Sequence, residues 1–322
     1  MTPAVSIGVP VYNGSSFLAQ ALESVCSQTF HDCEIIISDN ASRDDTAAIC
    51  RSFANRDRRV RYVRQPYTIP PAENHNFVAR EARGKYFKWA TYDDMCAPLF
   101  LERCVEVLER DPSVVLCFPK AAVVDASGAI LQHYEFPLAT DSRRAAERFG
   151  SIIRADHRRY GAFEIYGVIR RDALDRIPAM GNYVSGDRVL LTRLVLRGRF
   201  QQVPDRLFLS REHSTRSVRT VPEGTRQRRR WLRRVLGVGP LPPLEWWDPS
   251  KKGAINFPEW RLIREYAASI RSAPICAVER VQCGAELLRW LFGDAPKLTR
   301  DVLLAIEQLA SGVPPRRRFS QT

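Results

Sequence analysis

Residues 5–46, VSIGVPVYNGSSFLAQALESVCSQTFHDCEIIISDNASRDDT, decide the fold class of this 322-residue chain. The run at 5–11 is almost continuously apolar and β-branched, which is typical of a strand buried on both faces. Residues 15–28 then carry apolar side chains at helical spacing, and residues 34–39 form a second apolar run. A strand, a helix and a second strand in this order predict a parallel sheet.

The same alternation continues to residue 119. Further strands are predicted at 60–65, 85–91 and 114–119, and further helices at 42–56, 72–82 and 98–111. The series predicts an α/β fold, with a mixed but mostly parallel, Rossmann-like sheet flanked by helices. In such a sheet ligands bind beyond the carboxyl ends of the strands. The residues that follow each strand are therefore the candidates for function.

The second half of the chain has a different character. The pattern between 120 and 215 is irregular, with one helix near 186–198. A connection rich in Pro, Gly and Trp follows at 238–258, and three helices are predicted after it, at 258–272, 275–292 and 296–311. We therefore predict a domain at 1–217 and a basic, helical region at 218–322.

The composition is strongly basic, with 49 Lys and Arg against 36 Asp and Glu, a net charge of +13. The runs 226–234 and 316–318 carry much of the excess, which favours a polyanionic partner for that part of the chain. No stretch approaches the roughly 18 apolar residues of a membrane span, and the first strand starts too early for a signal peptide. The expected location is cytoplasmic, with the eight cysteines mostly small buried hydrophobic residues.

Polar residues follow three of the predicted strands. They are Tyr12 and Asn13 after the first, Asp39 at the end of the second, and Asp93 and Asp94 after the run at 85–91. Two adjacent carboxylates repel each other unless a cation lies between or beside them. An alternative is that the acid pair caps the helix that begins near residue 98.

These motifs, together with the segment at 181–217, agree in order and spacing with a known family. Residues 4–217 resemble inverting glycosyltransferases of family 2, which have the GT-A fold, of the type that builds bacterial cell-envelope polysaccharides. The resemblance implies a hexosyltransferase-type enzyme with a nucleoside-diphosphate sugar as donor. It also implies a hydroxyl of a glycan or lipid-linked acceptor.

The resemblance assigns several residues to the donor. Pro10, Tyr12 and Asn13 match the first-strand motif that flanks the base, and Asp39 matches a carboxylate that accepts a hydrogen bond from a base N–H. Asn76 stands where similar enzymes carry polar donor-site residues. From the residues alone, Asp39 could instead cap the helix from 42, and Asn76 could cap its own helix.

The acid pair matches the metal motif of the family, which implies Mn²⁺ or Mg²⁺ as cofactor. Thr91 stands where many relatives have an earlier acid, so the residue in direct contact with the ion stays open. We favour Asp94, with Asp93 toward the ribose or the ion's water shell. His213 matches a histidine near the metal or the diphosphate, and the neighbouring Arg211 and Arg216 are candidate phosphate ligands.

Asp187 matches the catalytic base. One carboxylate is needed to accept the proton of the acceptor hydroxyl as that oxygen attacks the anomeric carbon. A single displacement inverts the anomeric centre and needs no second carboxylate as a nucleophile. Asp187 also lies at the start of a predicted helix, where it could serve only to stabilise the helix N-terminus.

Three further questions concern the activity of the protein and its binding partners. The missing earlier acid leaves open a non-catalytic protein that binds sugar nucleotides. The charge of +13 suggests a nucleic-acid-binding protein, but no known reading motif is present, so no nucleic-acid partner is expected. The segment 226–236 surrounds Trp231, Leu232 and Val235 with arginines, which suits either peripheral docking on an anionic membrane or a solvated basic face.

Overall fold

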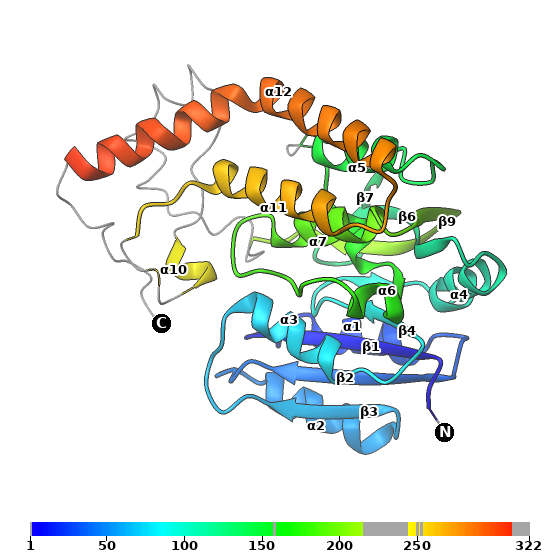
Figure 1. Cartoon of the computed structure of the whole chain (residues 1–322). Coiled ribbons are helices and arrows are strands. Elements are labelled where there is room, and N and C mark those ends of the chain that lie inside the picture. Colours follow the sequence, from blue (N-terminus) through cyan, green and yellow to red (C-terminus); the bar gives the residue numbers. More distant parts are fainter. Residues whose placement is uncertain (1, 157–158, 215–243, 249–250, 252–253, 311–322) are drawn as a thin grey trace.

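The computed structural model describes residues 2–156, 159–214, 244–248, 251 and 254–310 (Figure 1). The described residues contain one mixed sheet with helices packed against it. Its strands are β1 (Val5–Val11), β2 (Cys33–Asp39), β3 (Val60–Arg64), β4 (Tyr86–Trp89), β5 (Met95–Cys96), β6 (Val114–Val124), β7 (Ile130–Tyr134), β8 (Val168–Arg170) and β9 (Arg199–Arg211).

The sheet runs in the order β3-β2-β1-β4-β8-β6-β9-β5, with β7 paired to β6. The pairs β3–β2, β2–β1 and β1–β4 are parallel. This confirms the parallel sheet that the first 119 residues of the sequence predict. Strand β8 is antiparallel to both of its neighbours, and β6 and β9 pair in parallel. The irregular part of the sequence therefore completes the same sheet.

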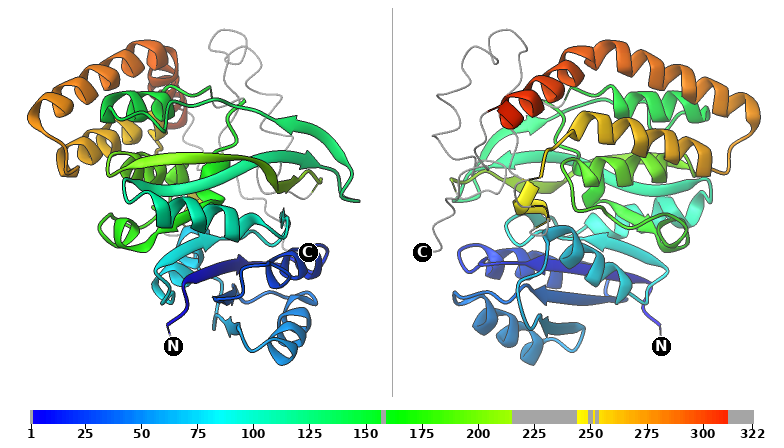
Figure 2. Two further views of the ribbon diagram at one scale, coloured as in Figure 1. Left: turned by 90° about the vertical axis from the view of Figure 1, so that its right-hand side faces the viewer. Right: turned by 60° about the vertical axis from the view of Figure 1, so that its left-hand side comes forward.

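The helices cover both faces of the sheet (Figures 1 and 2). One core cluster joins β1 and β2 to α1, α2 and α4, and a second joins β4 and β6 to α3, α5, α6 and α7. The helices are α1 (Leu18–Cys26), α2 (Thr46–Arg56), α3 (Pro71–Arg80), α4 (Phe100–Arg110), α5 (Ala145–Ile153), the 3₁₀ helix η1 (Phe163–Tyr166), α6 (Arg171–Asp175), α7 (Gly186–Val195), α10 (Leu244–Trp247), α11 (Pro258–Ser272) and α12 (Ala277–Ala310).

The C-terminal helices differ from the prediction in one respect. Helix α11 has the predicted bounds, but the helices predicted at 275–292 and 296–311 are one continuous helix, α12, with Pro296 inside it. A proline in a helix interior removes a hydrogen bond and costs about 3 kcal/mol. Packing on both sides of Pro296 offsets this cost: Trp290 is buried before it, and Asp301 accepts a hydrogen bond from the backbone N–H of Glu259 after it (2.8 Å).

Helices α11 and α12 share a hydrophobic core with α5 and α7 (Figure 2). Phe149 of α5 and Trp290 of α12 each meet the ring of Tyr266 edge to face, with ring centroids 6.2 and 5.2 Å apart. The C-terminal helices therefore pack on the sheet domain. The predicted boundary at 217 lies outside the described residues and stays a prediction. No helix of the described residues is both long and apolar enough to cross a lipid bilayer.

Candidate functional site

The turns after β1 and β2 are tied together at the carboxyl edge of the sheet. Val11 and Asp39 are register partners, so the two strands end side by side. Asn13 has φ +49°, a left-handed conformation that Asn tolerates better than most residues. Three backbone N–H groups of the first turn donate to side chains of the second: Asn13 to Ser42 (2.9 Å), Gly14 to Thr46 (2.9 Å) and Ser15 to Asp44 (3.0 Å).

Asp39, the predicted reader of the base, is wholly buried. Its Oδ1 accepts a hydrogen bond from the backbone N–H of Ser42 (2.8 Å), and its Oδ2 accepts one from the hydroxyl of Tyr62 (2.9 Å). Burial, followed by the hydrogen bond to Asp39, raises the pKa of Tyr62 to about 12. Helix α2 begins at Thr46, so Asp39 shapes the turn before the helix and is not its N-cap. Direct contact with a base requires this turn or Tyr62 to move.

The other predicted donor residues differ in exposure. Tyr12 follows the buried Pro10 and is 44% exposed, so part of its side chain is open to a ligand. Asn76 is buried on α3, where its amide nitrogen donates to the backbone oxygen of Met180 (2.8 Å) and its amide oxygen accepts from the N–H of Met180 (3.0 Å). Asn76 thus fixes the loop before α7, and its predicted contact with the donor stays a prediction.

The acid pair lies in the turn between β4 and β5, with both side chains buried. The backbone N–H of Asp94 donates to the hydroxyl of Thr91 (3.1 Å), so Thr91 shapes this turn. Asp94 Oδ1 accepts a hydrogen bond from the backbone N–H of Arg211 (2.8 Å), and Asp93 Oδ2 lies 3.0 Å from Nε2 of His213. The end of β9 therefore meets the acid pair.

Arg211 holds this turn in place. It is fully buried, and all three guanidinium nitrogens already donate to protein atoms. The partners are the backbone oxygen of Asp93 for Nε (3.0 Å), the backbone oxygen of Ala126 for one terminal nitrogen (2.6 Å) and the side-chain oxygen of Gln20 for the other (2.7 Å). The predicted role of Arg211 as a phosphate ligand does not fit this placement. Arg211 is a positioning residue.

We expect Arg211→Gln to lower the free energy of unfolding by about 2–4 kcal/mol, because it leaves buried carbonyl oxygens without donors. Urea denaturation of the variant and of the wild type measures this difference. Arg206→Gln is the matched control: it changes another arginine of β9, which pairs with the exposed Glu135, and it should cost less than about 1 kcal/mol. An equal loss of unfolding free energy in the two variants would contradict the proposed role of Arg211 in holding the turn.

His213 and Asp93 are two adjacent side chains at this turn that could hold a divalent ion. The His213 ring packs against Phe17, with centroids 4.7 Å apart, which fixes the ring beside the carboxylate. Among the described residues, no group of three or more His, Cys, Asp or Glu side chains is arranged to hold a metal. Mg²⁺ and its analogues commonly take only one or two protein ligands and complete their shell with phosphate oxygens and water. A pair of protein donors is therefore compatible with the implied ion.

Asp187, the predicted base, belongs to a second group of residues at the start of α7. A Cβ atom at Gly186 would lie 2.4 Å from the backbone oxygen of Gly181, so the tight turn before the helix requires glycine there. Asn182 ties this turn to Glu73 of α3 (3.0 Å). Burial lowers the pKa of His75 on α3, and the nearby Asp187 carboxylate opposes the shift. Asp187 itself is half-buried.

Sequence reasoning assigned no defined role to Glu164 of η1. It is buried, and its carboxyl accepts a hydrogen bond from Tyr160 (2.9 Å). Burial raises the pKa of Glu164 to about 7. The charge of Arg188 lowers the pKa of Tyr160 and the charge of Asp187 raises it, although burial is the main cause of its raised pKa. Both residues belong to α7, so Tyr160 and its partner Glu164 lie near the start of that helix. Lys88, inside the predicted apolar strand, was likewise missed; it is buried over the ring of Phe100 (4.0 Å).

The protonated form of Glu164 is favoured in the folded state, so its contribution to stability is present below pH 4.5 and is lost as the pH rises through about 7. The loss amounts to up to about 3 kcal/mol, at 1.4 kcal/mol per pH unit. We expect Glu164→Gln to remove this dependence. Urea unfolding at pH 5 and pH 8 should show a smaller difference for the variant than for the wild type; an unchanged difference would contradict the assignment.

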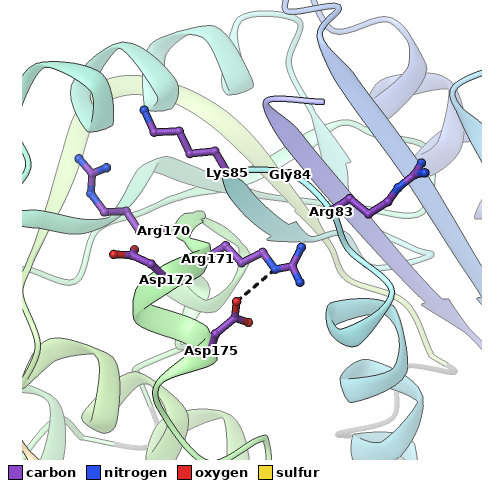
Figure 3. Close-up of a pocket in the computed structure, with 7 residues that line it drawn as sticks. All are labelled: Arg83, Gly84, Lys85, Arg170, Arg171, Asp172 and Asp175. Atoms are coloured by element: carbon purple, nitrogen blue, oxygen red, sulfur yellow. Dashed lines mark ion pairs between the residues drawn. The ribbon is translucent and has the colours of Figure 1, made fainter. Parts of the chain in front are cut away.

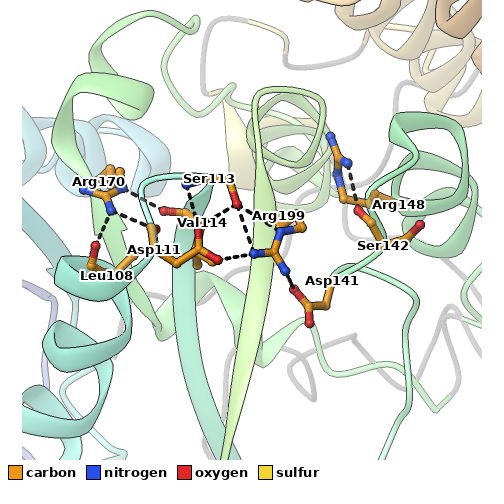
Figure 4. A network of polar contacts seen from close by, with 9 residues as sticks. All are labelled: Leu108, Asp111, Ser113, Val114, Asp141, Ser142, Arg148, Arg170 and Arg199. Carbon is orange, nitrogen blue, oxygen red and sulfur yellow. Dashed lines mark hydrogen bonds and ion pairs between the residues drawn. The ribbon is translucent and has the colours of Figure 1, made fainter.

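Two cavities lie at the opposite, amino-terminal edge of the sheet, and each is lined by an arginine that pairs with a carboxylate. One cavity of about 400 Å³ contains Arg171, which pairs with Asp175 at 3.3 Å (Figure 3). The other, of about 510 Å³, contains Arg199, which pairs with Asp141 at 2.7 Å (Figure 4). Nearby, Arg170 donates to the backbone oxygen of Val114 (2.7 Å). These arginines have protein partners, and the candidate residues from the sequence lie instead at the carboxyl edge.

Two sequence predictions fall outside the described residues. They are the phosphate role of Arg216 and the membrane-docking segment 226–236.

Comparison with known proteins agrees with this fold. The model of the family described as glycosyl transferase family 2 matches residues 6–175. A glycosyltransferase named GlyG from Streptococcus pneumoniae is 32% identical over 117 residues, which cover 36% of this chain and 39% of that one. A chondroitin synthase from Escherichia coli is 31% identical over 138 residues, which cover 42% and 20%. The match thus spans less than half the length of either relative.

Solved structures show the same fold. Residues 1–349 of TarS from S. aureus superpose with a TM-score of 0.61 at 15% identity, covering 90% of this chain and 72% of that one. A complex of the same TarS fragment with UDP-GlcNAc gives a TM-score of 0.55 at 14% identity, covering 98% and 94%. These are GT-A structures, which confirms the predicted fold class. Because the family model matches more than half of the chain, the chain belongs to glycosyltransferase family 2.

Proposed function

We propose that this chain is a metal-dependent, inverting hexosyltransferase. It transfers a sugar from a nucleoside-diphosphate donor to a hydroxyl of a glycan or lipid-linked acceptor. One observation carries the proposal: the acid pair and His213 meet at the carboxyl edge of the sheet, the same edge at which the turns after β1 and β2 are tied together. This edge is where parallel sheets bind their ligands.

The donor would lie along this edge. The exposed ring of Tyr12 offers an apolar surface to the base, and Asn13 fixes the turn that follows it. Asp39 would stabilise the turn beside this surface through its hydrogen bonds with Ser42 and Tyr62. The diphosphate would then point toward Asp93 and His213. The family membership, and a complex of the TarS fragment with UDP-GlcNAc, support a nucleotide-sugar donor.

Asp93 and His213 would hold the divalent ion, Mn²⁺ or Mg²⁺. The ion would neutralise charge on the diphosphate as the bond to the sugar breaks. Asp94 has a different task in this proposal, because its Oδ1 is engaged by the backbone N–H of Arg211. The sequence alone favoured Asp94 as the residue in direct contact with the ion. We now propose Asp93 for this contact.

Asp187 would accept the proton of the acceptor hydroxyl. The acceptor oxygen then forms its bond to the anomeric carbon while the bond from that carbon to the diphosphate oxygen breaks, with attack and departure on opposite faces of the sugar. One displacement inverts the anomeric configuration. The loop before α7 is fixed to α3 by Asn76 and Asn182, which would keep Asp187, the second residue of α7, in place before the acceptor binds.

The test is a panel of nucleoside-diphosphate sugars with the full chain, assayed for release of nucleoside diphosphate with Mn²⁺ and with a chelator. Metal-dependent release from one donor, increased by a glycan or lipid-linked acceptor, supports the proposal. Thermal stabilisation by a nucleoside diphosphate without turnover on any donor or acceptor favours the non-catalytic binding protein. Stabilisation by DNA alone favours the nucleic-acid-binding protein.

A further inference from the structure

The loop before α7, residues 178–185, ends in a tight turn directly before Asp187. Ser185 has φ +63°, a left-handed conformation that a residue with a side chain rarely adopts unless the surrounding structure holds it there. The backbone N–H of Gly186 donates to the backbone oxygen of Tyr183 (3.1 Å), so the position of Tyr183 influences where α7 and Asp187 begin. Contacts that hold this loop therefore also position Asp187.

Part of this support comes from Arg193 on α7. One of its terminal nitrogens donates to the backbone oxygens of Pro178 (3.0 Å) and Ala179 (3.3 Å), at the start of the loop. The other donates to Oε2 of Glu265 on α11 (2.8 Å). The two side chains of this ion pair are only 10% and 13% exposed, so salt and water screen it less than a surface pair. Glu265 thus fixes the guanidinium that binds the loop.

Glu265 also contacts an arginine at the other end of the loop. The guanidinium of Arg261 on α11 lies over the ring of Tyr183, with its central carbon 4.1 Å from the ring centroid. Its Nε is 3.9 Å from Oε1 of Glu265. Burial raises the pKa of Tyr183, the charge of Glu265 raises it further, and the charges of Arg193 and Arg261 oppose the shift. One carboxylate therefore contacts two arginines, one for each end of the loop.

The charges show what the loss of this carboxylate would do. Arg193 and Arg261 carry like charges, which repel each other when the carboxylate is removed. A third arginine, Arg264, lies 3.4 Å from Oε1 of Glu265, but its side chain is 74% exposed and water screens its charge. A buried charge without a partner is unfavourable, so the two inner guanidinium groups would move toward solvent. The loop would then lose its partners at both ends.

We propose that Glu265 is a positioning residue for the transfer step, acting through Arg193 and Arg261 on the loop before Asp187. The inference rests on the proposed role of Asp187 as the base. Helix α11 lies beside α7 and shares a hydrophobic core with it (Figures 1 and 2). The C-terminal helices would thus support the acceptor side of the enzyme. A displacement of a reacting group by about 1 Å can lower a rate about 10²-fold, so a small shift of the loop is enough.

The experiment is a double-mutant cycle with the full chain, built from Glu265→Gln and Asp187→Asn. Glutamine keeps the size of the side chain and is a good helix former, but it removes the charge. Turnover is measured as acceptor-dependent release of nucleoside diphosphate, and nucleotide affinity by titration. Two changes that act through the same group give non-additive effects, whereas independent losses multiply. Hydrogen exchange measures the loop directly, without turnover, and shows whether the rest of the chain stays folded.

The matched control is Glu286→Gln. Glu286 is an acid of α12 whose side chain is 12% exposed, and it pairs with Arg154 and Arg289. Its replacement therefore removes a similarly buried carboxylate from the C-terminal helices, with partners outside the loop before α7. Urea unfolding should show a comparable loss of stability in Glu286→Gln and Glu265→Gln. A difference in turnover between these two variants then reports on position and not on stability.

We expect Glu265→Gln to lower turnover about ten- to a hundredfold, to leave nucleotide affinity unchanged and to speed hydrogen exchange in residues 178–190. In the Asp187→Asn background the same change should lower turnover less than about twofold. The control should keep full turnover and slow exchange in the loop.

Unchanged loop exchange in Glu265→Gln would overturn the proposal, as would a full multiplicative loss of turnover in the double variant. Normal turnover in Glu265→Gln beside a slow Asp187→Asn would overturn the role of Glu265 alone. Normal turnover in Asp187→Asn would refute the proposed base and this inference with it.

Discussion

Replacing Asp187 with Asn is expected to lower turnover about 10²- to 10⁴-fold, the usual contribution of a positioned general base. The variant keeps the size of the side chain and an oxygen that can accept the hydrogen bond from the backbone N–H of Arg188. It loses only the capacity to accept a proton. The residues proposed to bind the donor lie on other elements, at the ends of β1, β2 and β4. Nucleotide affinity should therefore stay nearly unchanged.

Steady-state kinetics with varied acceptor, together with titration of the nucleoside diphosphate, measures both quantities. Asp205→Asn is the matched control, since Asp205 is an exposed acid of β9, and it should leave both quantities unchanged. A combined loss of turnover and nucleotide affinity in Asp187→Asn would place this residue in the donor site. Normal turnover would refute the assignment of the base, with Glu164 the next acid to replace.

Asp93→Asn and Asp94→Asn should differ sharply, although both remove one charge from the same turn. Asp93 faces Nε2 of His213, so its loss should remove the ion's main carboxylate and lower metal-dependent turnover roughly 10³-fold, equivalent to several kcal/mol of charge stabilisation. Asp94 accepts a hydrogen bond from the backbone of Arg211, and an asparagine oxygen can accept the same bond. Asp94→Asn should therefore retain most of the activity.

Calorimetric titration of Mn²⁺ in the presence of nucleoside diphosphate separates the two roles from effects on folding. The Asp93 variant should lose the metal-dependent heat, whereas the Asp94 variant should keep it. Unfolding by urea should give similar stability for both variants. The reverse result, with metal binding lost only in Asp94→Asn, would return the direct contact to Asp94.

The sequence predicted the first half of the fold because its signals there are local. A strand buried on both faces is an apolar, β-branched run, as in residues 5–11 and 34–39, and the helices between the strands have clear apolar spacing. The signals are weaker after residue 120, where strands such as β8 are only three residues long. At Pro296 a local rule gave the wrong answer, because burial of Trp290 and Ala305 outweighed the cost of a proline.

The site was predictable in part for the same reason. Acids placed directly after apolar strands are visible in one sequence, and parallel strands bring their carboxyl ends to one edge. The tasks of Arg211 and Asp39 were not visible, because their partners come from distant positions. Arg211 is held by Gln20, 191 residues away, and Asp39 by Tyr62, 23 residues away. No local pattern encodes contacts of this kind.

The ties between the first two turns also limit how the enzyme can be re-engineered. Each of the three hydrogen bonds uses a backbone N–H from the turn after β1 and a side chain from the turn after β2, including Ser42 and Thr46. A graft that replaces only one turn would leave donors or acceptors of the other without partners. Under the proposed donor site, an exchange of nucleotide preference between relatives would have to move residues 12–15 and 39–46 together.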